Sequence, residues 1–143
     1  MYQILYKSEC RIPEERLESE IKNILSSAAV NNKRDGITGL FLLIENRFLQ
    51  LMEGEEADVK KCMERIKNDS RHSELTVLMQ RPVPQRLFPK WSMHYSRLNG
   101  SQALEKLGAS KMQDLGITQW QENFKDNLAI MLLESFARLG HIS

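Results

Sequence analysis

"GITGLFLLIENRFLQLMEG", residues 36–54, contains two β-prone runs joined by a short polar connection. Residues 36–44 and 47–54 are rich in leucine, isoleucine and phenylalanine, and only Glu45-Asn46 separates them. Two such runs around a tight polar connection predict a β-hairpin, which ends at Gly54. The remaining elements are placed around this hairpin.

One polar residue interrupts the second run of the hairpin. Residues 48–49 and 51–52 are apolar, whereas Gln50 carries an amide with two donors and an acceptor oxygen. A buried polar group without a partner costs about 1–3 kcal/mol. Gln50 therefore either bonds a neighbouring backbone group or belongs to a polar site inside the protein.

Further elements flank the hairpin on both sides. Apolar residues at helical spacing form a stripe in each of two helices, namely Leu17, Ile21, Ile24, Leu25 and Ala28 in the first and Val59, Cys62, Met63 and Ile66 in the second. The predicted order is a strand at 2–7, a helix from Pro13, the hairpin, a helix at 55–68 and strands at 73–80 and 91–98. Pro82, Pro84 and Pro89 predict an extended crossing between the last two strands. This β-α-β-β-α-β-β order is the ferredoxin-like α+β pattern with an added strand, with both helices on one sheet face.

The C-terminal part of the chain has a different pattern. Asn99 and Gly100 mark a boundary, so we expect a core at 1–98 and a helical cap of the same domain at 99–143. Two helices are predicted near 101–115 and 118–139, and the second has a broad apolar face. That face has to cover the free face of the sheet, a partner subunit, or both.

Composition excludes several classes of protein. The 143 residues fit one domain, and a net charge of +1 predicts no attraction to nucleic acid or an anionic membrane. The first ten residues have too short an apolar stretch for a signal peptide, and the longest apolar run, 40–44, is far shorter than a membrane span. Cys10 and Cys62 have no metal-binding or CxxC spacing, which favours reduced thiols in a cytoplasmic protein.

The sequence contains no recognisable catalytic constellation. Its histidines, His72, His94 and His141, lack metal-ligand spacing. A phosphate-binding loop and a GxSxG motif are also missing. These residues alone therefore do not indicate catalysis, and the resemblance described below implies a non-enzymatic protein.

Several polar side chains are nevertheless aimed inward. Tyr6 shares the face of Ile4 by the period of two in a strand, and Asn31 and Asn32 continue the stripe of the first helix if that helix extends so far. Other interpretations remain open: Tyr6 as a core aromatic with its hydroxyl at the rim, and the asparagines as a helix end and turn. Together with Gln50, these residues predict a polar pocket between helices and sheet, without identifying its ligand.

Five segments of the chain match the motifs of a known family in the family's order, over residues 1 to about 98. The chain resembles the BLUF family, the photoreceptor domains that sense blue light using flavin, and its tail resembles the capping helices of short, stand-alone members. The matching segments are ILYKS (4–8), NNKRDGITGL (31–40), RFLQLMEG (47–54), RIKNDSRH (65–72) and FPKWSM (88–93).

The resemblance implies a role for each candidate site residue around a non-covalently bound flavin. FAD is the family's usual cofactor, and FMN is the alternative. Tyr6 matches the photoactive tyrosine, Gln50 the switching glutamine, and Asn32 the residue that bonds the flavin C4 carbonyl and N3 edge. Asn31 lies next to Asn32, Ser8 matches a small polar residue near Tyr6, and Ile24 and Phe48 are implied apolar walls. The helix-end cluster around the flavin's polar edge and ribityl-phosphate tail is matched by Arg65, Asp69, Arg71 and His72, and the strand that rearranges in light is matched by Trp91 and Met93.

The implied function is a blue-light receptor that signals through protein–protein contacts. Excited flavin takes an electron and a proton from the tyrosine, both return, and the glutamine is left in a new hydrogen-bonding pattern. The implied partners are an unidentified downstream protein and further copies of the chain in a dimer or larger homo-oligomer. The alternatives are a ferredoxin-like regulatory module that binds another small ligand without photochemistry, and a small flavin-dependent redox enzyme.

Overall fold

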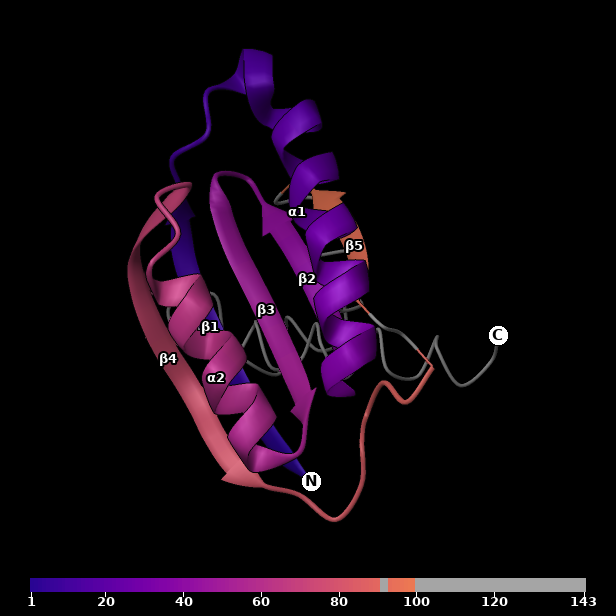
Figure 1. The fold of residues 1–143 in the computed structure, drawn as a ribbon. Coiled ribbons are helices and arrows are strands. Elements are labelled where there is room, and N and C mark those ends of the chain that lie inside the picture. Colours follow the sequence, from indigo (N-terminus) through magenta and orange to yellow (C-terminus); the bar gives the residue numbers. More distant parts are fainter. Residues whose placement is uncertain (91–92, 100–143) are drawn as a thin grey trace, which may run out of the picture.

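The computed structural model describes residues 1–90 and 93–99. The elements are β1 (Tyr2–Cys10), α1 (Glu14–Asp35), β2 (Thr38–Ile44), β3 (Arg47–Gly54), α2 (Glu56–Lys67), β4 (His72–Pro82) and β5 (His94–Leu98) (Figure 1). This is the predicted β-α-β-β-α-β-β order. The predicted cap helices near 101–115 and 118–139 and the candidate residue Trp91 lie outside the described residues.

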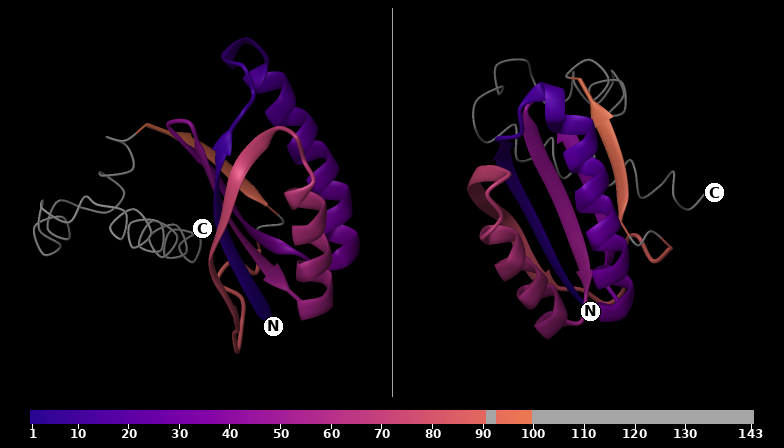
Figure 2. Two further views of the ribbon diagram at one scale, coloured as in Figure 1. Left: turned by 90° about the vertical axis from the view of Figure 1, so that its left-hand side faces the viewer. Right: turned by 45° about the horizontal axis from the view of Figure 1, so that its top comes forward.

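The strands form one mixed five-stranded sheet in the order β4-β1-β3-β2-β5. β5 runs parallel to β2, and the other neighbouring strands are antiparallel. Both helices cover the same face of the sheet, as the views in Figures 1 and 2 show. The α+β architecture is therefore confirmed, with β5 as the added strand at one edge.

The hairpin forms where the sequence predicts it, and its ends reflect local backbone chemistry. Ile44 pairs with Arg47, which leaves Glu45 and Asn46 as the turn, and Glu45 has a φ of 56°. β2 begins at Thr38 rather than at residue 36, because Gly36 ends α1 in the left-handed conformation with a φ of 67°. The amide of Gly36 donates to the carbonyl of Asn32, as does that of Ile37.

Further predicted strand boundaries were wrong: β1 extends to Cys10 rather than to residue 7. β4 spans His72–Pro82 rather than 73–80, and it includes a proline that was expected to exclude regular structure. Proline is tolerated there because β4 is at the edge of the sheet and Pro82 is its last residue. The last described strand begins at His94 rather than at residue 91, so Met93 precedes it.

The alternation of side chains along the strands gives the sheet two different faces. The face under the helices carries two apolar clusters, Ile4, Tyr6, Ile37, Met52, Val59, Cys62 and Met63, and Cys10, Ile12, Leu17, Ile21, Phe41, Leu43 and Phe48. On the opposite face lie Leu5, Leu40, Leu42, Leu49, Leu51, Phe88 and Leu98. Phe88 belongs to residues 83–90, hereafter the crossing segment, which is neither helix nor strand and leads from β4 toward Met93.

Candidate functional site

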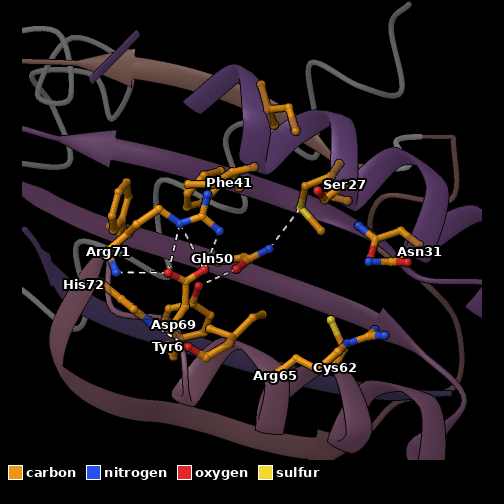
Figure 3. A pocket seen from close by; sticks show the side chains of 17 residues that line it. Tyr6, Ser27, Asn31, Phe41, Gln50, Cys62, Arg65, Asp69, Arg71 and His72 are labelled. Carbon is orange, nitrogen blue, oxygen red and sulfur yellow. Dashed lines mark hydrogen bonds and ion pairs between the residues drawn. The ribbon is translucent and has the colours of Figure 1, made fainter. Parts of the chain in front are cut away.

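A cavity of about 180 Å³ lies between the two helices and the sheet (Figure 3). Its walls come from β1, α1, β2, β3, α2, the connection from α2 to β4, the start of β4 and the residue before β5. The structure brings most of the predicted site residues to this cavity: Tyr6, Ile24, Asn31, Asn32, Phe48, Gln50, Arg65, Asp69, Arg71, His72 and Met93. The structure therefore has a cavity where the sequence predicts a pocket, and among the described candidates Ser8 does not line it.

A chain of side-chain hydrogen bonds passes through Gln50 on the floor of the cavity. Tyr6 and Gln50 are register partners on β1 and β3, and their side chains are 3% and 8% exposed. The Tyr6 hydroxyl donates to Gln50 Oε1 (Figure 3), and Gln50 Nε2 donates to Met93 Sδ at 3.4 Å. The buried amide thus joins a phenol at its oxygen to a thioether at its nitrogen, and these side chains are its partners.

The environment of Tyr6 keeps its phenol neutral. Burial raises the pKa of Tyr6 well above its ordinary value, and the nearby Cys62 and Asp69 add to the increase. A neutral phenol retains the proton that it donates to Gln50. Tyr6 is therefore available as a hydrogen-bond donor throughout the physiological pH range.

Ser8 contributes to the site indirectly, by contacting the His72 side chain. His72 Nε2 lies 2.6 Å from the carbonyl oxygen of Ile66, so this nitrogen carries a proton, because a carbonyl can only accept. His72 Nδ1 lies 2.7 Å from Ser8 Oγ. These contacts connect β1, the end of α2 and the start of β4, and hold the His72 ring 6.2 Å from that of Tyr6 between centroids.

Charged residues gather at two ends of the cavity. At one end, Arg71 Nε donates to Asp69 Oδ1 at 2.9 Å, and Arg71 also pairs with Glu20 of α1 at 3.5 Å. The hydrogen bond from the Arg71 side chain lowers the pKa of Asp69, so this carboxyl is ionised at neutral pH. At the other end, Arg65 pairs with Asp35 at 3.3 Å, which connects α2 to the last residue of α1. The cavity therefore has apolar walls with a guanidinium group at each end.

The asparagines lie within α1, which extends to Asp35. Asn32 is 3% exposed and Asn31 is half-buried, and both line the cavity. The carbonyl of Asn32 accepts the backbone bonds that end α1, so the interpretation of the two residues as part of the helix end is confirmed, whereas they do not form a turn. Their amides are polar groups on an otherwise apolar helical stripe.

Other residues line the cavity that were not singled out for the site: Leu25, Ser27, Ala28, Phe41, Cys62 and Ile66. Leu25, Ala28, Cys62 and Ile66 belong to the predicted apolar stripes of the helices. A stripe that faces a cavity has the same periodicity as one that faces a packed core, so the sequence had no signal to separate them.

Residues 1–90 and 93–99 contain neither a metal-binding cluster nor a membrane-spanning helix. No cluster of three or more histidine, cysteine or acidic side chains in these ranges is arranged to hold a metal ion. None of the described helices combines the length and apolar character needed to span a bilayer.

Comparison with known proteins identifies a family. The family model described as "BLUF: Sensors of blue-light using FAD" matches residues 1–94. The chain is 30% identical over 91 residues to photoactivated adenylate cyclase subunit beta of Euglena gracilis, covering 63% of this chain and 10% of that protein. It is 30% identical over 116 residues to the blue light- and temperature-regulated antirepressor BluF of Escherichia coli (strain K12), covering 77% of this chain and 28% of that one. The chain therefore spans about a tenth of the length of the cyclase subunit and less than a third of the antirepressor.

Solved structures share the fold of the described residues. The chain aligns with the dark-state structure of BlrB, titled a BLUF protein, with a TM-score of 0.72 at 24% identity over 96% of both chains. It aligns with the ground state of BlsA with a TM-score of 0.70 at 27% identity, covering 92% of this chain and 87% of that one. A structure of Klebsiella pneumoniae BlrP1 with FMN and cyclic diGMP gives a TM-score of 0.60 at 25% identity, covering 67% and 25%.

Proposed function

The chain belongs to the BLUF family of flavin-based blue-light sensors, and from that membership we propose that the cavity between its helices and sheet is the flavin site. The proposed switch is the hydrogen-bond chain Tyr6–Gln50–Met93. The observation that carries this proposal is the buried Gln50 amide, which is bonded at both ends to side chains within that cavity. Each end has a different partner, so the orientation of the amide determines which bonds exist.

The donor set of the cavity fits a flavin. A flavin has a planar aromatic ring system with a polar edge and carries a phosphate at the end of a ribityl chain. Ile24 and Phe48 supply apolar walls for the ring, and the amides of Asn31 and Asn32 are suited to its polar edge. Arginines are suited to the phosphate, and we assign the cluster Arg65, Asp69, Arg71 and His72 to the polar edge of the flavin and its ribityl-phosphate tail, with Ser8 holding His72 in place.

The exchange of hydrogen bonds follows from the chemistry of the amide. A bound flavin supplies the absorption of blue light and, once excited, an acceptor for the electron and proton of a nearby phenol. Tyr6 releases its hydroxyl proton and regains it, and during this exchange Gln50 is free to reorient. Its nitrogen then faces Tyr6 and its oxygen faces Met93, whose thioether cannot donate a hydrogen bond. The contact between Gln50 and Met93 is therefore lost in the light state.

The output of the sensor is assigned to protein contacts. Nothing in the family match indicates an enzyme, and the cyclase relatives are about ten times longer than their matched part. We therefore assign to the chain no catalysis of its own. We assign it FAD rather than FMN as cofactor, a cytoplasmic location and a homo-oligomeric state. Its downstream partner is assigned as a protein that binds the rearranged segment around Met93. In this assignment residues 1–98 bind the flavin, and residues 99–143 form a cap of the same domain.

One absorption experiment tests the photochemical function. We expect the protein purified with excess flavin to be yellow and to show a small, reversible red shift after blue light. Red light, which flavin does not absorb, serves as the control and should leave the spectrum unchanged. The flavin released by denaturation then identifies FAD or FMN by chromatography. A colourless protein under these conditions would favour the regulatory module, and flavin bleached with substrate turnover would favour the redox enzyme.

Asn32 provides a separate test of the flavin site. We expect Asn32→Ala to lower the flavin-to-protein ratio, because a buried amide that bonds the ring edge is lost, with affinity falling about tenfold. Alanine suits a helix interior, so the loss should not arise from a weakened α1. The matched control is Asn23→Ala, which removes an exposed amide from the same helix. A wild-type flavin ratio in Asn32→Ala would remove this residue from the site.

A further inference from the structure

The sheet face opposite the cavity contains a fully buried carboxylate. Glu53, on β3, is 0% exposed and is the only charged side chain among residues 1–90 and 93–99 in the buried class. It accepts hydrogen bonds from Gln3 Nε2 at 3.1 Å, from the Leu87 amide at 2.7 Å and from the Phe88 amide at 3.3 Å. Charged side chains are rarely buried unless their bonding capacity is satisfied. Glu53 is thus satisfied chiefly by the backbone of the crossing segment.

The crossing segment depends on these bonds for its position. It is neither helix nor strand, so no ladder of its own fixes it. Arg86 adds a second attachment: its guanidinium donates to the carbonyls of Gly36 at 2.7 Å and Glu53 at 3.0 Å, and to the Thr38 hydroxyl at 2.8 Å. Residues 86–88 are therefore attached to β3 and to the start of β2.

The same strand also contacts Met93, which lies three residues after the crossing segment. Gln50 lies three residues before Glu53 on β3 and faces the opposite side of the sheet. Gln50 Nε2 donates to Met93 Sδ at 3.4 Å. β3 thus holds residues 86–88 through Glu53 on one face and Met93 through Gln50 on the other.

We propose that Glu53 is a positioning residue of the light switch: by anchoring residues 86–88, it holds Met93 within reach of the Gln50 amide. This inference rests on the proposed photochemical function. In the dark, the Met93 contact stabilises the orientation of Gln50 seen in the structure. Loss of the anchor removes that stabilisation and leaves the light state favoured relative to the dark state, so the return to the dark spectrum becomes slower.

A double-mutant cycle on the rate of dark recovery tests the proposal. Glu53→Gln keeps the shape of the side chain but cannot accept from the Leu87 amide with both oxygens. We expect Glu53→Gln and Met93→Leu each to slow recovery by about two- to tenfold. The double variant should be no slower than the slower single variant, because both changes remove the same contact. A purely structural role for Glu53 would give effects that multiply.

The controls separate the anchor from its surroundings. Arg81→Gln removes the bond from Arg81 Nε to Gln3 Oε1 within the same polar network but leaves the crossing segment attached, and it should recover at the wild-type rate. If Glu53→Gln does not fold with flavin, Arg86→Leu replaces it in the cycle, since it removes the second attachment of residues 86–88. Wild-type recovery in the anchor variant, or multiplicative effects in the cycle, would overturn the role of Glu53. A wild-type protein without a red-shifted state would instead show that the photochemical function itself is absent.

Discussion

Tyr6→Phe is expected to yield a protein that binds flavin but keeps its dark spectrum under blue light. The phenylalanine ring retains the packing of Tyr6 in the core under α2, so the cavity keeps its shape. The variant lacks the hydroxyl that donates to Gln50 Oε1, and with it the proton that the switch requires. We therefore expect the red-shifted state to be lost completely, as measured by difference absorption after blue light.

A matched control distinguishes this effect from the general loss of a phenol. Tyr2 lies on the same face of β1 but outside the cavity, where its ring is 5.2 Å from Lys60 Nζ. Tyr2→Phe should therefore show the wild-type red shift. In Tyr6→Phe the buried Gln50 oxygen loses a donor, and the free energy of unfolding should fall by about 1–3 kcal/mol. A normal light state in Tyr6→Phe would exclude Tyr6 from the mechanism.

Gln50→Leu is expected to abolish the usual red shift by removing the group that changes orientation. Leucine is of similar size and suits the apolar neighbours of residue 50, so the variant should fold and bind flavin. Leucine can neither accept a hydrogen bond from Tyr6 nor donate one to Met93, so both contacts of the Tyr6–Gln50–Met93 hydrogen-bond chain are lost together. Difference absorption should therefore show no shift of the wild-type kind, while the flavin-to-protein ratio stays sufficient to measure one.

An exposed glutamine serves as the control for Gln50→Leu. Gln80 lies on β4 at the surface, and Gln80→Leu should switch as the wild type does. Combining Tyr6→Phe with Gln50→Leu should give the same difference spectrum as either single variant, because each substitution interrupts the same hydrogen-bond chain. A wild-type red shift in Gln50→Leu would mean that another residue near the flavin carries the switch.

The elements that depend on local chemistry were predictable from the sequence. The hairpin follows from two β-prone runs around Glu45-Asn46, and the helices follow from the periodicity of their apolar residues. Asn31 and Asn32 were ambiguous because the choice between helix and turn depends on where the helix ends. Gly36 decides it, because its left-handed conformation places the end of α1 after Asp35.

Features that depend on contacts between distant parts of the sequence were harder to predict. That Gln50 needs a partner was evident from the pattern, but its bond to Tyr6 requires the pairing of β1 with β3. Glu53 has the appearance of an ordinary acidic residue near a turn. It is buried because the amides of Leu87 and Phe88, more than 30 positions later, meet it on the far face of the sheet. The pattern of apolar and polar residues around Glu53 therefore gives no indication of this contact.

The position of β5 has a consequence for repeated cycles of light and darkness. Met93 directly precedes β5, which pairs in parallel with β2 and lies at the edge of the sheet. An edge strand held by one ladder can loosen at little cost, whereas the central pairing of β1, β3 and β2 keeps the other walls of the cavity in place. We therefore expect the proposed flavin to stay bound through repeated cycles of illumination and darkness.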